Sequence, residues 1–247
     1  MARLASPHRR RRLAAAVACL LCTVPAASPT ARAGDLDTLL FGSLDAGAAN
    51  FLSIGAKIAL DKLDRPGFVA LASLGGGRRN EMACGCDSWG SARLSRYTVL
   101  GAALAGYQWF PDWGVVALYA GPEGAYEALT DGRSVATLPM RWGLRLHGEV
   151  WARPTDESLV QATLVLGSAR DSAWSRIALG YRAWGFYFGP EVSLYADRTG
   201  YTKWNFGAHA TDFAVGIYSF RVSGGVQVES TERRPSPYLA LSVWTPW

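Results

Sequence analysis

The sequence predicts an all-β protein, a transmembrane antiparallel up-and-down β-barrel of about 12 strands. Three observations lead to this class. Segments of about ten residues in which apolar and polar side chains alternate recur along the chain. Trp and Tyr are abundant, at 10 residues each, and Gly occurs 27 times. Beyond residue 33, no apolar run reaches the length of about 18 residues that predicts a membrane-spanning helix.

The first 33 residues have the layout of a secretory signal peptide. A basic run, Arg9 to Arg12, precedes an apolar core from Leu13 to Val24, and the segment ends in Ala31-x-Ala33. We expect cleavage after Ala33, with the stretch 26–28 as the alternative site. The apolar core of 12 residues is shorter than the ~20 residues that a membrane anchor needs. Residues 34–247 are therefore expected to form the barrel in the bacterial outer membrane.

Loss of this segment changes the charge of the chain. It removes six of the 25 Lys and Arg residues and none of the 20 acidic residues, so 19 basic and 20 acidic residues remain. The formal net charge of +5 belongs to the precursor. The basic pI is thus no argument for a nucleic-acid partner, and we expect none.

Two of the four cysteines, Cys84 and Cys86, remain after residue 33. Their C-G-C spacing within the polar segment 78–91 allows a small disulfide loop in an oxidising compartment. A metal site needs more ligands than this neighbourhood offers. We interpret both as idiosyncratic loop cysteines, and we expect neither a metal nor another cofactor.

Twelve alternating segments predict twelve strands. They are 38–46, 50–60, 67–77, 96–109, 114–126, 139–152, 157–168, 174–184, 185–196, 202–212, 215–229 and 236–247. Barrels of this kind have short turns on the side of the chain termini and longer loops on the other. The longest gaps, 78–95 and 127–138, fall on one side, and the tight links 110–113, 154–157 and 184–185 fall on the opposite side. The lengths of the connections thus agree with the barrel topology.

The stretch MRWGLRLHGEVWAR, residues 140–153, places charged residues inside an apolar segment with a period of two. A strand puts the apolar residues on one face and nearly all the charges on the other. An Arg on the lipid side at mid-bilayer costs ~2–4 kcal/mol. We therefore expect the apolar face to meet lipid and the charged face to point into the barrel.

The same alternation predicts which side chains line the lumen. These are Lys57, Tyr119, Glu123, Arg141, Arg145, His147, Glu149, Trp151, Arg153, Arg176, Arg182, Tyr187, Glu191, Tyr195, Arg221 and Glu229. Two interpretations remain open. In the structural one, Glu and Arg neutralise one another and brace the wall, because an unpaired buried charge is costly. In the functional one, the aromatic rings stack on sugars in a narrow polar passage while the arginines donate hydrogen bonds.

The tripeptide Gly-Pro-Glu occurs at 121–123 and again at 189–191. Proline lacks an amide donor, so within a strand it tends to mark a bulge or a fixed register. The structural interpretation is a repeated kink. The alternative is a ligand-binding role for the two carboxylates, Glu123 and Glu191.

An enzyme is the competing class of protein. Barrel hydrolases and acyltransferases need a general base within hydrogen-bonding distance of a nucleophile. Beyond residue 33 the only histidines are His147, predicted to point inward, and His209, which has only Thr211 near it on its own face. The chain has no G-x-S-x-G motif. We therefore expect no enzymatic activity and no catalytic residues.

Several strand segments resemble the cellulose biosynthesis protein BcsS family of alphaproteobacteria. They are LFGSLDAG (40–47), AALAGYQW (102–109), GEVWARPT (148–155), ALGYRAWGFYFGPE (178–191) and above all SPYLALSVWTPW (236–247). The resemblance covers most of residues 34–247. The loop with Cys84 and Cys86 departs from the usual pattern of the family.

This resemblance implies an outer-membrane protein associated with the synthesis and secretion of bacterial cellulose. The implied partners are outer-membrane lipid, the β-glucan itself and other components of cellulose secretion. Support of export or surface anchoring of the β-glucan is the first hypothesis. A general small-solute or oligosaccharide porin is the second, and a lipid- or glycan-modifying enzyme is the third.

Overall fold

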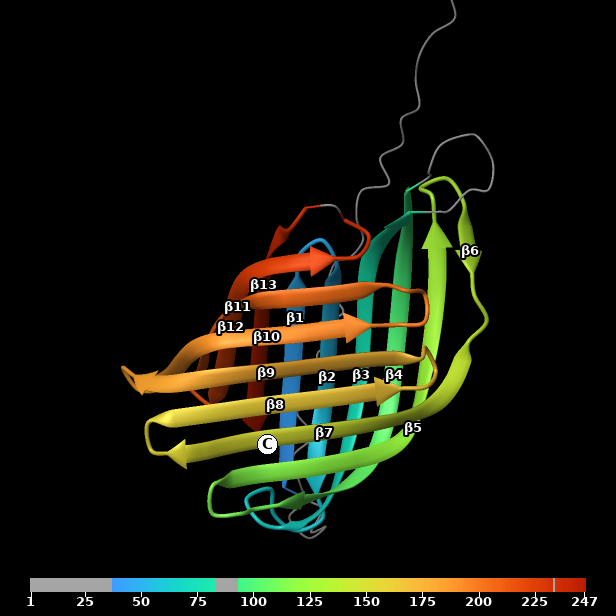
Figure 1. The fold of residues 1–247 in the computed structure, drawn as a ribbon. Coiled ribbons are helices and arrows are strands. Elements are labelled where there is room, and N and C mark those ends of the chain that lie inside the picture. Colours follow the sequence, from blue (N-terminus) through green and yellow to red (C-terminus); the bar gives the residue numbers. More distant parts are fainter. Residues whose placement is uncertain (1–36, 83–92, 233) are drawn as a thin grey trace, which may run out of the picture. The chain divides into compact units, whose positions relative to one another are not determined.

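The computed structural model describes residues 37–82, 93–232 and 234–247, which form antiparallel β-strands (Figure 1). The predicted signal peptide and the loop with Cys84 and Cys86 lie outside the described residues. In the described part of the chain, no helix is long and apolar enough to cross a membrane. The strands are β1 (Thr38–Ala46), β2 (Asn50–Ala59), β3 (Gly67–Met82), β4 (Arg93–Trp109), β5 (Gly114–Thr130), β6 (Val135–Thr137), β7 (Arg141–Thr155), β8 (Ser158–Gly167), β9 (Ser172–Ala183), β10 (Phe186–Ala196), β11 (Thr202–Val215), β12 (Tyr218–Glu229) and β13 (Ser236–Pro246).

Twelve of these thirteen strands close into a ring of antiparallel neighbours. The ring closes where β1 pairs with β13, from Leu39 opposite Pro246 to Ala46 opposite Leu239. The short strand β6 stands outside the ring and pairs only with the end of β5. Closure pairs the backbone groups of the first and last strands, which an open sheet would leave exposed. The predicted fold class, an up-and-down barrel of 12 strands, is confirmed.

The predicted strand bounds agree well with the structure except at the ends of the longest strands. β3 continues to Met82 where the pattern predicted an end at residue 77, and β5 continues to Thr130 instead of residue 126. Strand β6 was missed altogether. The extensions carry polar residues on both faces, as in Arg78-Arg79-Asn80-Glu81, so alternation no longer marks them.

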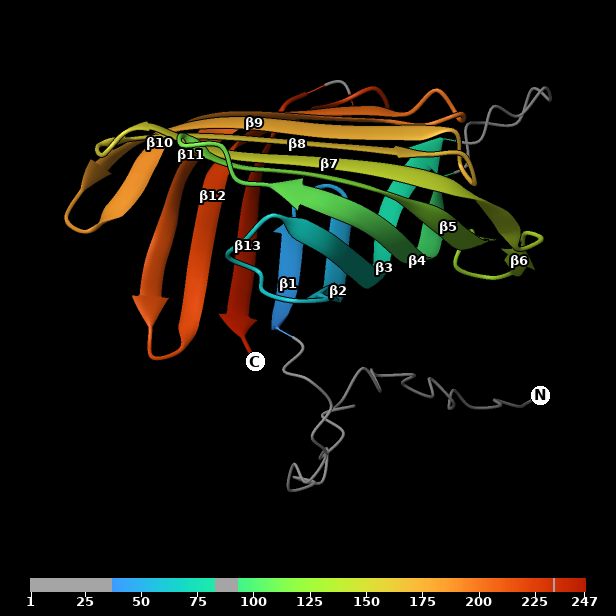
Figure 2. The same cartoon turned by 90° about the horizontal axis from the view of Figure 1, so that it is seen from below.

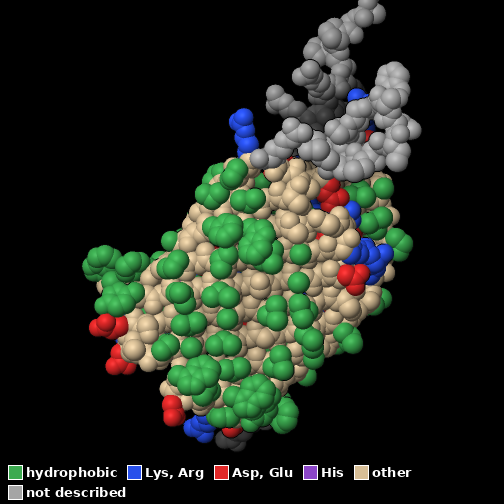
Figure 3. All heavy atoms as spheres, viewed as in Figure 1, with side chains coloured by type: hydrophobic (Ala, Val, Ile, Leu, Met, Phe, Trp, Pro, Cys, Tyr) green, Lys and Arg blue, Asp and Glu red, His purple; other side chains and the backbone are tan. Residues whose placement is uncertain are grey.

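The side chains alternate between the outside and the interior as predicted. On β7, Trp142, Leu144 and Leu146 are exposed on the outer surface, whereas the alternate residues from Gly143 to Trp151 are at least partly buried. On β12, the outward Val222 and Val226 flank a row of buried polar residues. Figure 3 shows hydrophobic side chains spread over the face formed by β7 to β10, with charged side chains gathered near its edges. This outer surface suits a hydrocarbon environment.

The barrel has two walls that face one another across the interior. Figure 2 shows β7, β8 and β9 crossing above β1, β2 and β3. The end at which β1 begins and β13 ends is called the terminal end here, and the opposite end is called the loop end. At the terminal end, the amide of Trp247 donates a hydrogen bond of 2.8 Å to the carbonyl of Thr38.

The connections follow the predicted parity. At the terminal end, β9 and β10 are joined by the two-residue turn Trp184-Gly185, and β11 and β12 by Gly216-Ile217. At the loop end, β5 and β7 are joined by residues 131–140, which include β6. A feature that alternation did not predict is the irregularity between Thr211 and Phe213 in the β11–β12 ladder, where Asp212 has a φ of 68°.

A charge placed on the outer wall should destabilise the barrel in lipid. Leu146 lies near the middle of β7 and is 50% exposed. We expect Leu146→Arg to lower the free energy of unfolding by ~2–4 kcal/mol, because the guanidinium would face hydrocarbon. The measurement is urea unfolding of the refolded protein in phosphatidylcholine vesicles.

The matched control is Val135→Arg, because Val135 on β6 is 70% exposed but lies outside the barrel ring. This variant should unfold like the wild type. Equal destabilisation by the two substitutions would contradict the assignment of the outer wall to lipid.

Candidate functional site

The terminal half of the interior is filled first by apolar side chains. Residues of β2, β3, β4 and β5 that point inward form a buried cluster: Ala59, Val69, Leu71, Leu104, Ala117 and Tyr119. Phe41 of β1 and Leu63 of the β2–β3 turn pack against this cluster. Each of these six residues is at most 4% exposed, so little water reaches them. This part of the barrel is therefore a packed core.

The β2–β3 turn closes over the same region. Gln108 is fully buried, and its side-chain amide donates hydrogen bonds to the carbonyls of Lys62, Leu63 and Arg65 at 3.3, 3.1 and 2.9 Å. The amide of Leu63 in turn donates to a carboxylate oxygen of Asp37 at 3.0 Å. The turn is thus fastened across the terminal end next to β4.

A charged group links the two walls beside the apolar cluster. Lys57 Nζ of β2 lies 3.6 Å from Glu149 Oε2 of β7, and His147 Nε2 lies 3.0 Å from the other oxygen of the same carboxylate. The Lys57 ammonium also stands 5.6 Å from the ring centre of Tyr119. Since β2 and β7 are not neighbours in the ring, this ion pair crosses the interior.

A second polar group joins β8, β10, β12 and β13. Arg221, which is 2% exposed, donates to Gln161 and to Glu191. Tyr238 donates its hydroxyl hydrogen to the other oxygen of Glu191 at 3.0 Å. The buried guanidinium and carboxylate thus pair with one another, and each has a further partner, Gln161 for Arg221 and Tyr238 for Glu191. This group fills the interior in front of β12.

Two more contacts reach across the interior from the end of β7. The Trp151 ring packs edge-to-face on Trp244 of β13, with centroids 6.1 Å apart. Arg153 Nη2 lies 3.0 Å from Asp212 Oδ2 of β11 at the rim. Asp212, whose carboxylate pairs with Arg153, is thus also the residue with the left-handed backbone conformation.

The loop end carries a network of ion pairs between the two walls. Its members, called the loop-end network here, are Arg79, Glu81, Arg96, Glu127, Arg170 and Asp197. Arg79 of β3 contacts Asp197 of the β10–β11 loop at 2.6 Å, and Arg170 of the β8–β9 turn contacts Asp197 at 3.0 Å and Glu127 of β5 at 2.9 Å. The network ties loops of one wall to strands of the other.

Asp197 is the centre of this network. Burial alone would raise the pKa of its carboxyl group, but hydrogen bonds from Arg79 and Thr199 and the charges of Arg79 and Arg170 outweigh burial. The pKa of Asp197 therefore lies below its ordinary value. The carboxylate stays ionised and holds both arginines.

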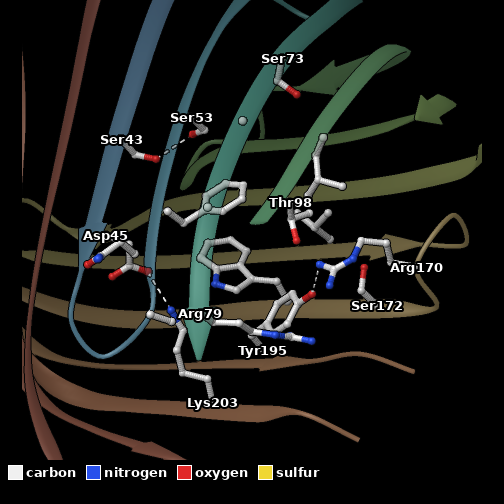
Figure 4. Close-up of a pocket in the computed structure, with 18 of the residues that line it drawn as sticks. Ser43, Asp45, Ser53, Ser73, Arg79, Thr98, Arg170, Ser172, Tyr195 and Lys203 are labelled. Atoms are coloured by element: carbon white, nitrogen blue, oxygen red, sulfur yellow. Dashed lines mark hydrogen bonds and ion pairs between the residues drawn. The ribbon is translucent and has the colours of Figure 1, made fainter. Parts of the chain in front are cut away.

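A cavity of about 310 Å³ lies in the loop half of the interior, between the apolar cluster and the loop-end network. Figure 4 shows Ser43, Ser53 and Ser73 on β1, β2 and β3. Lys203 of β11 reaches from the other wall to Asp45 at 3.3 Å, and Tyr195 receives a hydrogen bond of 2.6 Å from Arg170. The aromatic rings of Phe51, Trp174 and Tyr201 also line the cavity.

The structure places the predicted lumen residues in two environments, the interior and the exposed rim, and three of the interior residues also line the cavity. In the interior, with charged partners, lie Lys57, Glu123, Arg145, His147, Glu149, Glu191 and Arg221, and with them lie Tyr119, Trp151, Arg176, Tyr187, Tyr195 and Glu229. Arg141, Arg153 and Arg182 are exposed, because they stand at strand ends where the lumen meets solvent. Arg145, His147 and Tyr195 line the cavity.

Most of the cavity residues were missed by the sequence analysis. The three serines, Asp45, Trp174 and Lys203 lie on the inward face of predicted strands but were not singled out, and the loop-end network lies largely beyond the predicted strands. The inward parity of Asp45 with the predicted strand 38–46 was the available signal. Pairing between loops far apart in the sequence leaves no periodic pattern.

The two Gly-Pro-Glu copies have the same local backbone structure. The ladder to the preceding strand is interrupted at Gly121-Pro122 and at Gly189-Pro190, and the register is the same on both sides of each interruption. Of the two expectations, a bulge or a fixed register, the structure shows the fixed register. A Cβ atom on Gly121 or Gly189 would lie 2.3 or 2.0 Å from a carbonyl oxygen of the neighbouring strand. Glycine therefore permits this close approach of two backbones.

Both carboxylates that follow these prolines form hydrogen bonds with other residues of the barrel interior. Glu123 accepts hydrogen bonds from Arg145 Nε at 2.8 Å and from the amide of Ala169 at 2.9 Å. Glu191 holds Arg221 and Tyr238. This geometry supports the structural interpretation of the repeat.

The histidines have structural contacts as well. His209 is 3% exposed, with Nδ1 2.7 Å from Thr211 Oγ1 and Nε2 3.1 Å from the carbonyl of Leu179. Since the carbonyl only accepts, Nε2 carries the proton and Nδ1 accepts from the hydroxyl. Among the described residues, no group of three or more His, Cys, Asp and Glu side chains is placed to hold a metal ion.

Removing the central carboxylate should weaken the loop end in a pH-dependent way. A lowered folded-state pKa stabilises the protein above the ordinary pKa of Asp, and this contribution is lost as the pH falls through the folded value. We expect Asp197→Asn to lower the free energy of unfolding at pH 7 by about 1.5–3 kcal/mol, as for hydrogen bonds to a charged group. The difference from the wild type should shrink below about pH 4.

Urea unfolding between pH 7 and pH 3 measures this effect. The control is Asp64→Asn, because Asp64 is an exposed member of a pair with Arg65 at 3.8 Å. The control should follow the wild type at every pH. A pH-independent loss in Asp197→Asn would contradict the role given to its charge.

The comparisons with known proteins bear on the whole barrel. A family model described as cellulose biosynthesis protein BcsS matches residues 39–247. Among solved structures, the KdgM porin in complex with disordered oligogalacturonate superposes with a TM-score of 0.43 at 10% identity, over 84% of this chain and 98% of that one. Pseudomonas putida OprB superposes with a TM-score of 0.32 at 10% identity, over 86% of this chain and 92% of that one. None of the curated proteins matches.

The family model spans every strand of the closed ring, from β1 to β13. The resemblance inferred from the strand segments is thereby confirmed. This chain belongs to the cellulose biosynthesis protein BcsS family, and its fold is a closed antiparallel β-barrel of the outer-membrane type.

Proposed function

We propose that this barrel anchors the β-glucan at the cell surface during its export, without forming the passage through which the glucan travels. The observation that carries the proposal is the division of the interior into two halves. The terminal half is filled by the apolar cluster and the polar groups around Lys57 and Arg221. The loop half holds the cavity.

The orientation of the barrel follows from the lengths of its connections. Outer-membrane barrels have short periplasmic turns and longer outer loops, so the terminal end faces the periplasm and the loop end faces the cell exterior. Cleavage after Ala33 in the periplasm would place β1 directly at the inner rim. With this orientation the cavity lies on the outer side, where secreted glucan arrives.

A passage for glucan needs an interior that is wide along its whole length. Eight strands are filled by side chains and sixteen leave an aqueous channel, so a ring of twelve can be of either kind. Here Tyr119 and Leu159, which are 1% exposed, and Gln108 occupy the terminal half. This packing favours an anchor over both the conduit and the small-solute porin.

The third hypothesis, an enzyme, has the least support. His209 uses both ring nitrogens within the wall, and His147 contacts Glu149 beside the apolar cluster. A lipid substrate would lie outside the barrel, far from these rings. The proposal therefore assigns no catalytic step to the protein.

The first test is genetic. Deletion of the protein should abolish cellulose retained at the cell surface, while synthase activity measured in isolated membranes stays at the wild-type level. Surface cellulose is quantified after separation from cellulose shed into the medium. Unchanged surface cellulose would refute the proposal, and loss of synthase activity would assign the protein to synthesis instead.

The second test addresses the filled interior. The refolded protein without its first 33 residues should give no stable single-channel conductance in a planar bilayer, because the terminal half is packed. A variant with Trp151→Ala and Trp244→Ala, which removes a contact across the interior, serves as the comparison. Stable conductance of the wild type that cello-oligosaccharides block would support a conduit, and conductance that they leave unchanged would support a general porin.

A further inference from the structure

We propose that the cavity in the loop half binds the end of a neutral glucan chain, with a hexose ring against the aromatic side chains and its hydroxyl groups on the serines and Asp45. This inference rests on the proposed function and names the site through which the barrel would hold the polymer.

The size and position of the cavity fit a chain end. Its volume of about 310 Å³ is at the small end of the ~300–1,000 Å³ range of ligand sites. Ala49 of the β1–β2 connection and Tyr201 of the β10–β11 loop, both at the loop end, belong to its lining. At its inner end lie Phe41 and Leu71, which belong to or pack on the apolar cluster. A ligand therefore enters from the outer side and stops inside the barrel.

The lining combines the two kinds of surface that a sugar offers. A hexose ring has apolar C–H faces and a rim of hydroxyl groups, so it suits aromatic faces flanked by hydrogen-bonding groups. Phe51, Trp174 and Tyr201 supply the rings. Ser43 and Ser53, whose hydroxyl oxygens lie 2.8 Å apart, and Ser73 supply small donors and acceptors along adjacent strands. Figure 4 shows these serines and Asp45 around the same space.

The charges around the cavity argue for a neutral ligand. Cationic side chains dominate the lining, and five of them are matched by an acid: Arg79 with Asp197, Arg96 with Glu81, Arg145 with Glu123, Arg170 with Glu127 and Lys203 with Asp45. The sixth, Arg78, is exposed and donates to Ser95. An anionic ligand would have to compete with these carboxylates for the same cations. A neutral sugar can accept hydrogen bonds from the guanidinium edges and leave the pairs intact.

Four buried polar atoms of lining residues have no hydrogen-bond partner among the described residues. They are Asp45 Oδ1, His147 Nε2, Arg170 Nε and the hydroxyl of Tyr201. Tyr201 is 4% exposed, so bulk solvent does not reach it freely. Buried polar groups are nearly always paired in native proteins. An acceptor, two nitrogens and a hydroxyl of residues around one cavity are atoms of the kind that pair with the hydroxyl groups of a sugar.

Binding is tested on the refolded protein without its first 33 residues, in detergent, by titration calorimetry with cellotetraose. Maltotetraose and a galacturonic acid tetramer are the comparison ligands. We expect saturable binding of cellotetraose and at least tenfold weaker binding of the charged tetramer. Absence of saturable cellotetraose binding by folded protein, or tighter binding of the charged tetramer, would overturn the proposal.

Two variants locate the site. Trp174→Ala removes a ring from the lining, and Ser73→Leu fills part of the cavity; each should weaken cellotetraose binding at least tenfold. The matched control, Trp151→Ala, also removes an inward tryptophan, but from the contact with Trp244 outside the cavity lining. It should bind like the wild type. Wild-type binding by both cavity variants, with folding verified by circular dichroism, would overturn the assignment.

The outcomes of the binding experiment and of the genetic experiment distinguish failure of the cavity site from failure of the anchoring function. Loss of surface cellulose on deletion, combined with a protein that does not bind cellotetraose, would overturn the cavity site and leave the anchoring function standing. Binding by the wild type, combined with unchanged surface cellulose on deletion, would overturn the anchoring function and leave the cavity as a glucan site.

Discussion

The pairing of β1 with β13 is the constraint on which the rest of this structure depends. Inside a bilayer, each unpaired backbone amide or carbonyl costs several kcal/mol. The first and last strands therefore have to meet, and residues 39–46 and 239–246 pair without a break. Once the ring is closed, every strand has one face toward lipid and one toward the interior. The side chains of the inward face then decide whether the ring encloses a channel or a core.

The interior is held together by partners that come from opposite walls. Lys57 and Glu149, Trp151 and Trp244, and Arg79 and Asp197 each join strands or loops that are not neighbours in the ring. These buried charges would be costly without partners, but the ion pairs add little net stability, because desolvation offsets much of their attraction. Their main effect is to fix the distance between the walls. Between the packed terminal half and the loop-end network, this distance leaves room for the cavity.

The sequence predicts the fold well and the site poorly, for one physical reason. Alternation with a period of two reports which solvent each face meets, so it identified all twelve ring strands and the inward orientation of residues such as Glu191 and Arg221. It reports nothing about which inward residues meet across the interior. Ser73 and Trp174 lie on different walls and about a hundred positions apart, and only the closed ring brings them to one cavity. Asp197 and Arg170 lie in loops, where no periodicity exists.

Under the function proposed above, the division of the interior would suit a polymer held at the cell surface. A wide open lumen would offer a glucan chain water on all sides and few fixed contacts, whereas a fully packed lumen would offer no entry. Here the apolar cluster bounds the cavity on its terminal side, and the rings of Phe51 and Tyr201 and the serine hydroxyls line the cavity toward the loop end. A chain end held there loses little freedom beyond its terminal rings, since the rest of the polymer stays outside. In this proposal, weak contacts at many such barrels would retain one polymer, because each further contact along the same chain is favoured by the high local concentration.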